Sequence, residues 1–204
     1  MMDPNLLIYL IVALATTTVG AVPLGLVNLS VLDSALKNDK RGATQIAYGA
    51  SVVEVFFALT SLLAGAKLSP FFEGNPVVRY FVFAVLLVSG LFFWFKTNKR
   101  TTRKQPGKSF GFLKGVLLNI VSIQVLLFWL LAATVLSAKQ WLPGTFQEVL
   151  LFLSGVWLAK MGVLKGYAFL AKIVATHAEK FSANTNRIIG IVLLVVAIVQ
   201  FIKI

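Results

Sequence analysis

The sequence predicts an all-α protein that crosses a membrane several times. Its mean hydropathy is +0.88, and 58% of its 204 residues are hydrophobic. Only 13% are charged, whereas soluble domains average about 25%. Several apolar runs approach or exceed the roughly 20 residues that span a bilayer as a helix. A β-barrel would show short alternating segments instead, so we predict six transmembrane helices.

The composition also excludes several kinds of site. The chain has no cysteine, which excludes disulfides and cysteine metal sites, and its single histidine, His177, lies in a predicted loop. We therefore expect no metal and no cofactor. The net charge of +12 could suggest nucleic acid, but the basic residues fall between the apolar runs. Basic cytoplasmic loops are the simpler cause, and we expect no nucleic-acid partner.

The expected spans, with edges good to a few residues, cover about 5–34, 42–64, 77–95, 111–137, 146–171 and 187–203. The first of them is too long for a cleavable signal segment and should remain in the protein. Basic residues are concentrated in the loops after spans one, three and five. The positive-inside rule puts these loops in the cytoplasm, so both termini should face outward. We treat 1–204 as a single transmembrane domain.

Span one is interrupted near Pro23. Proline cannot donate a backbone hydrogen bond and clashes with the preceding turn, while Gly20 and Gly25 make unwinding easier. Bare backbone groups at membrane depth are tolerated only inside protein or against a water-filled cavity. Two interpretations stay open here. One is a broken helix that offers Pro23, Gly25 and Asn28 to a substrate, and the other is an ordinary proline kink.

Span two carries Glu54 near its middle, with no basic residue between Gly42 and Ala66. A carboxylate at this depth costs several kcal/mol unless it is paired, protonated or hydrated. Steps of three and four residues from Glu54 meet a stripe of small residues, namely Ala47, Ala50, Ser51, Ala58, Ser61 and Gly65. Small residues allow close helix packing, so Glu54 should face protein. It is either functional or a protonated structural acid.

Spans four and five carry the other polar groups. Asn119 and Ser122 share a face with Gly115 at helical spacing, whereas Gln124 should point elsewhere. Each of these polar side chains either forms a hydrogen bond to another helix or contacts substrate. Lys160 lies near the middle of span five, too deep to reach the surface as easily as the lysine five residues later. Span three is a uniformly apolar helix that we interpret as scaffold, and span six is a plain apolar helix.

The two halves of the chain resemble each other as inverted repeats, about 1–95 and 111–204, joined by a basic cytoplasmic loop at 96–110. A glycine precedes the only mid-span charge by five residues in each half, as Gly49 before Glu54 and Gly155 before Lys160. Inverted repeats place binding sites at the midplane on their interface. Glu54 and Lys160 are then natural partners, either functional or a purely structural ion pair.

These residues resemble the lysine exporter (LysE-type) superfamily of small bacterial translocators. The resemblance rests on Pro23-Leu-Gly25-Leu-Val-Asn28, the basic turn Lys37 to Arg41, Gly49 with Glu54 in the second span, the basic central loop, and Asn119 in span four. It covers essentially the whole chain and is strongest to a divergent branch found in Bacteroidetes-type bacteria. The chain departs from the family pattern in two places. Where the family has Pro-Gly-Pro, Pro23 is followed by Leu24 and then Gly25, with no second proline, and where the family has Asn-Pro, Asn119 is followed by Ile120.

The resemblance implies secondary active export of amino acids or related metabolites across the bacterial cytoplasmic (inner) membrane, coupled to H⁺ or Na⁺, in a monomer or an oligomer. The implied substrate- and ion-binding residues are Glu54, Lys160, Pro23, Gly25, Asn28, Asn119 and Ser122. The sequence carries no HExxH, GxSxG or Cys/His motif, so we expect no enzyme. A non-transporting membrane scaffold is the first alternative, and a cation transporter is the second.

Overall fold

The computed structural model describes residues 6–74, 111–138 and 140–173, with single positions between 80 and 95 and between 191 and 198. All described secondary structure is helical. The chain divides into two compact units, residues 1–66 with 105–176 and residues 67–104 with 177–204. The two apolar clusters and the cavity lie in the first unit. The predicted spans at 77–95 and 187–203 and the basic loop at 96–110 lie outside the described ranges.

The first predicted span is two helices, α1 (Leu6–Ala21) and α2 (Leu26–Leu36), whose axes differ by 76°. The break follows from Pro23, because the residue before a proline is disfavoured in the helical region and the ring offers no N–H. Gly25 caps α2 in an extended conformation with φ −107° and ψ −175°. The break itself, as against an ordinary kink, is therefore confirmed, whereas the binding of a substrate at Pro23, Gly25 and Asn28 stays a prediction.

The next helix, α3 (Lys40–Gly74), is continuous through the predicted second span. Asp39 Oδ1 accepts a hydrogen bond of 2.8 Å from the Gly42 N–H, which satisfies a first-turn donor of this helix. The small-residue stripe around Glu54 is buried as predicted over its described side chains, whereas Val52 and Phe56 on other faces are at least half exposed.

The fourth predicted span is also broken, which the sequence analysis missed. It consists of α5 (Gly111–Ile120) and α6 (Ile123–Ala138), and the axes of the two segments differ by 64°. The fifth span is the single helix α7 (Phe146–Phe169), which begins at a capping box formed by Thr145 and Glu148. By length and composition, α3 to Ala64 and α7 can each cross a membrane, and each bent pair can supply one more span.

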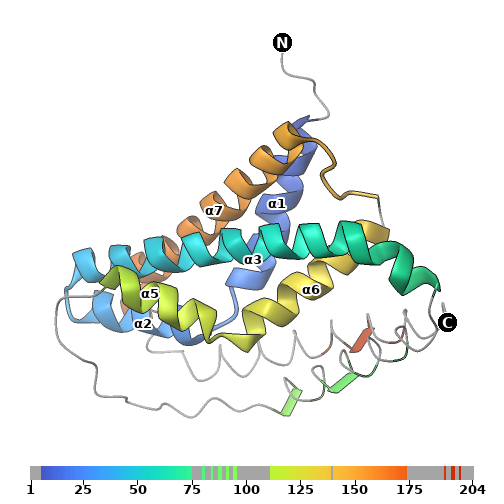
Figure 1. Cartoon of the computed structure of the whole chain (residues 1–204). Helices are drawn as coiled ribbons and strands as arrows, with labels where there is room; N and C mark the ends of the chain where they lie inside the picture. Colours follow the sequence, from blue (N-terminus) through green and yellow to red (C-terminus); the bar gives the residue numbers. More distant parts are fainter. Residues whose placement is uncertain are drawn as a thin grey trace. The chain divides into compact units, whose positions relative to one another are not determined.

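Helices α1 and α7 lie side by side along much of their length, and α2 contacts both α7 and α5 (Figure 1). Helices α3 and α5 cross at two glycines with their backbones in contact. A Cβ at Gly49 would overlap the Phe112 carbonyl, and a Cβ at Gly115 would overlap the Ile46 carbonyl. This close approach explains why the crossing carries glycine on both helices.

The buried apolar side chains form two clusters. One joins α2, the first part of α3 and the last part of α7, around residues such as Val31, Ile46 and Leu164. The other joins α1, a later part of α3, α6 and the first part of α7, around Trp129 and Phe152. The unbroken helices α3 and α7 pass through both clusters. Other large apolar side chains are exposed, as expected where lipid is the solvent.

Candidate functional site

Glu54 and Lys160 form a buried ion pair at the level where α3 and α7 pass from one apolar cluster to the other. Lys160 Nζ lies 2.9 Å from Glu54 Oε2, and the two side chains are 4% and 2% exposed. Along α3, Ala50 belongs to the first cluster and Ala58 to the second, with Glu54 between them. The pairing predicted from the sequence is therefore present.

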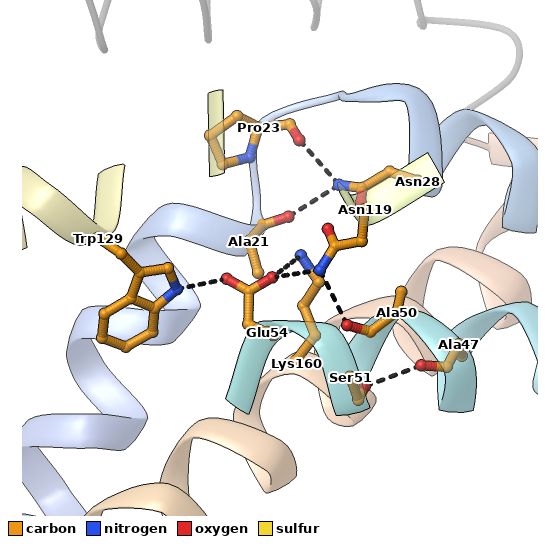
Figure 2. A network of polar contacts seen from close by, with 10 residues as sticks. All are labelled: Ala21, Pro23, Asn28, Ala47, Ala50, Ser51, Glu54, Asn119, Trp129 and Lys160. Carbon is orange, nitrogen blue, oxygen red and sulfur yellow. Dashed lines mark hydrogen bonds and ion pairs between the residues drawn. The ribbon is translucent and has the colours of Figure 1, made fainter. Parts of the chain in front are cut away.

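Two further donors complete the contacts of Glu54 (Figure 2). Asn119 Nδ2 donates to Oε2 at 3.1 Å, and Trp129 Nε1 donates to Oε1 at 2.9 Å. Asn119 Nδ2 also donates to the Ala50 carbonyl at 2.9 Å. Asn119 is the next-to-last residue of α5, Trp129 belongs to α6, and Lys160 belongs to α7. A single carboxylate on α3 thus contacts both sides of the α5–α6 break and also α7.

The α1–α2 break is closed by side chains as well. Asn28 Nδ2 donates to the carbonyl oxygens of Ala21 and Pro23, at 2.8 Å each. The Tyr167 hydroxyl of α7 donates to the Val22 carbonyl between them. Three consecutive carbonyls that the break removes from regular helix bonding thus have donors, which buried backbone groups require.

A cavity of about 20 Å³ lies between the two breaks, large enough for about one water molecule. Of the predicted site residues, those that line it are Pro23, Gly25, Asn28, Asn119, Ser122 and Lys160. Glu54 does not line it but pairs with Lys160, which does. The structure thus brings all seven predicted residues into one polar centre, while their roles in binding stay a prediction.

Three residues of this centre were missed. Gln124 was predicted to point elsewhere, which is wrong, because it lines the same cavity. The prediction extended the helical period of α5 through Ser122, where the helix in fact breaks. Trp129 and Tyr167 stood in apolar runs without a polar pattern. The only available signal was that a buried indole N–H or phenol O–H needs an acceptor.

The described residues hold no group of three His, Cys, Asp or Glu side chains close enough to bind a metal ion. A family model for the LysE type translocator matches residues 18–203. The chain belongs to this family. Its members are transporters, so this LysE-type protein is a multi-pass membrane translocator of a family without enzymes. Neither a curated protein nor a solved structure matches it significantly. The assignment to a Bacteroidetes-type branch stays a prediction.

Proposed function

We propose that this protein is a secondary active transporter that exports amino acids or related small metabolites across the bacterial cytoplasmic membrane by alternating access. The observation that carries the proposal is the buried Glu54–Lys160 pair beside a cavity flanked by two helix breaks. Both termini face outward in this proposal, and the lipid bilayer is the constant partner.

The pair favours a functional role because it is a poor device for stability alone. Removing two charges from water costs several kcal/mol per ion, and well-packed apolar residues often stabilise as well or better. Ionisable residues within membrane segments typically mark ion or substrate paths. The apolar composition of this chain makes a retained pair of opposite charges, both at most 4% exposed, more informative still.

The packing of the two halves supports the inverted-repeat arrangement that alternating access uses. If α1, α2 and α3 correspond to α5, α6 and α7, then the contact of α1 with α7 corresponds to the crossing of α5 with α3. Gly155 of α7 lies against α1, where an added Cβ would be 2.9 Å from the Leu10 carbonyl oxygen. Gly49 of α3 lies in the same way against the Phe112 carbonyl of α5. The α2–α5 and α1–α6 contacts form a further matched pair.

The contacts of Glu54 support coupling to a proton. Asn119, Trp129 and Lys160 all donate to the carboxylate. A protonated Glu54 would lose at least one of these bonds, and with it a contact to α7 or to the α5–α6 break. A state with different contacts around Glu54 would bind the proton with different affinity, which is what coupling requires. The carbonyls of the α1–α2 break already accept side-chain donors, which disfavours Na⁺ at that position.

The test is transport by the purified full chain in liposomes loaded with labelled amino acids. We expect efflux that accelerates with an imposed proton gradient in the wild type. A Glu54→Gln variant should lose this acceleration, and Asp33→Asn, which removes an exposed carboxylate, should retain it. Wild-type, gradient-driven efflux by Glu54→Gln would refute the coupling role.

A scaffold without transport activity is distinguished by a charge exchange. The Glu54→Lys/Lys160→Glu protein restores an ion pair between α3 and α7. If both this variant and the wild type fold yet show no ion-dependent flux of any tested amino acid, the proposed function is wrong and the scaffold is favoured.

A further inference from the structure

The first turn of α2 borders the cavity. Gly25 is the N-cap residue and supplies no side-chain acceptor. The N–H groups at the start of an α-helix have no acceptor within the helix, and here they belong to Leu26, Val27 and Asn28. Leu26 and Val27 line the cavity together with Gly25. The positive end of the helix dipole adds to these donors, so the position suits an anionic group.

The acceptors of the same break are already used. The carbonyls of Ala21 and Pro23 accept from Asn28, and the carbonyl of Val22 accepts from Tyr167. The α1–α2 break therefore offers N–H donors to a ligand, whereas these three carbonyls already accept hydrogen bonds. This balance favours a carboxylate over a cation at this end of the cavity.

An independent observation at the α5–α6 break points to a ligand with a donor. Asn119 is completely buried, and its Oδ1 has no hydrogen-bond partner among the described residues. Its Nδ2 is turned toward Ala50 and Glu54, and Figure 2 shows Oδ1 on the other side of the amide, toward Ala21 and Asn28. A buried acceptor without a donor is costly, and an ammonium group would supply the missing bond.

The charges of the centre limit the rest of the ligand. Among the described residues that line the cavity, Lys160 is the only ionisable one, and Glu54 neutralises it. In the part of the chain that the structure describes, the lining offers no carboxylate that could pair with a cationic side chain. We propose that the cavity, once expanded, binds a zwitterion with an uncharged side chain, its carboxylate on the α2 N–H groups and its ammonium on Asn119 Oδ1. The assignment rests on the proposed transport function.

A proline at position 26 tests the proposed carboxylate contact, because it removes one backbone N–H group. Leu26→Pro removes a single first-turn N–H at the position where proline is tolerated best in a helix, and Gly25 already has the extended conformation that precedes proline. Leu26→Ala is the matched control, because it keeps the N–H and loses the same side chain, which is half exposed. Equal melting temperatures of the two proteins establish that both fold.

The binding measurement uses L-leucine, L-lysine and two analogues of leucine that lack one charged group, 4-methylpentanoate and 3-methylbutylamine. We expect the wild type to prefer L-leucine over L-lysine and over each analogue by at least about tenfold, the value of one charge-assisted hydrogen bond. Leu26→Pro should weaken L-leucine binding by about tenfold relative to Leu26→Ala and leave 3-methylbutylamine unchanged.

Each other result overturns the inference. Equal L-leucine affinities of Leu26→Pro and Leu26→Ala refute the carboxylate contact. If Leu26→Pro does not fold, less than tenfold discrimination between L-leucine and its analogues by the wild type refutes the zwitterion. Transport of L-lysine without L-leucine refutes the uncharged side chain but leaves the proposed function standing, whereas transport of no amino acid refutes both.

Discussion

Lys160 of α7 reaches Glu54 of α3 across 2.9 Å, in an interior where both side chains are at most 4% exposed. The chain contains a natural comparison. Lys37 Nζ also lies 2.9 Å from Asp33 Oδ2, but these side chains are 63% and 38% exposed and stand one turn apart on the surface. The two pairs have the same N–O distance and differ in burial and in the number of further donors to the carboxylate.

The first prediction concerns the loss of one partner from each pair. Glu54→Gln and Lys160→Met should each lower the free energy of unfolding by about 3–5 kcal/mol, because each leaves a buried charge without compensation. The double variant should lose much less than the sum. Asp33→Asn should change stability by at most about 1 kcal/mol. Unfolding in mixed detergent measures the stability of all four variants. If the double variant loses the sum of the two single losses, Glu54 and Lys160 do not stabilise each other.

The second prediction concerns the indole of Trp129. Trp129→Phe keeps an aromatic ring against Phe152 but removes the N–H that donates to Glu54 Oε1. We expect a loss of about 1–2 kcal/mol, between the average membrane hydrogen bond of about 0.6 and the upper range for charged acceptors of about 3. Trp157→Phe is the control, because this indole packs on Tyr48 and is not among the donors to Glu54. Equal effects would show that only ring volume matters.

The third prediction concerns the crossing of α3 and α5. Gly49→Ala and Gly115→Ala should each destabilise the protein by about 1–3 kcal/mol, because the added methyl group meets a backbone carbonyl that cannot move alone. Gly162→Ala on α7 is the control. Nothing lies within 4 Å of its added Cβ, so this change should be neutral or stabilise by about 0.5–1 kcal/mol. Thermal unfolding measures the stability of the three variants. A Gly49→Ala protein as stable as the wild type would contradict the close approach of α3 and α5.

The fourth prediction concerns the hydroxyl that closes the α1–α2 break. Tyr167→Phe leaves the Val22 carbonyl without its donor and should cost about 1–3 kcal/mol, the penalty for a buried group left unsatisfied. Because Val22 adjoins the cavity-lining residues Ala21 and Pro23, transport should also slow. Tyr48→Phe serves as the control, since Tyr48 is 41% exposed. A Tyr167→Phe protein as stable and active as Tyr48→Phe would show that the bond is dispensable.

Much of the centre could be predicted from the sequence because it obeys strong constraints. A carboxylate and an ammonium in apolar helices each need an opposite charge, which was enough to pair Glu54 with Lys160. Proline stops a helix by simple sterics, which located the first break. The small-residue stripe faced protein for the same reason that small residues allow helices to approach.

The parts that escaped prediction depend on tertiary contacts. No proline or glycine lies between Asn119 and Ser122, so nothing local marks the second break. There the helix ends where the Asn119 amide binds α3 through Ala50 and Glu54. The position of Gln124 depends on that break, and the acceptor of Trp129 lies 75 residues earlier in the chain. Local periodicity carries no information about such partners.

The direction of the Glu54 contacts also bears on how the protein enters the membrane during synthesis. Its three donors, Asn119, Trp129 and Lys160, all follow it in the sequence, so the ribosome delivers the carboxylate before any of them. Asn28, in contrast, binds carbonyls within seven residues of itself and can close the first break at once. The contacts of Glu54 can therefore be completed only after α7, which carries Lys160, has been synthesised.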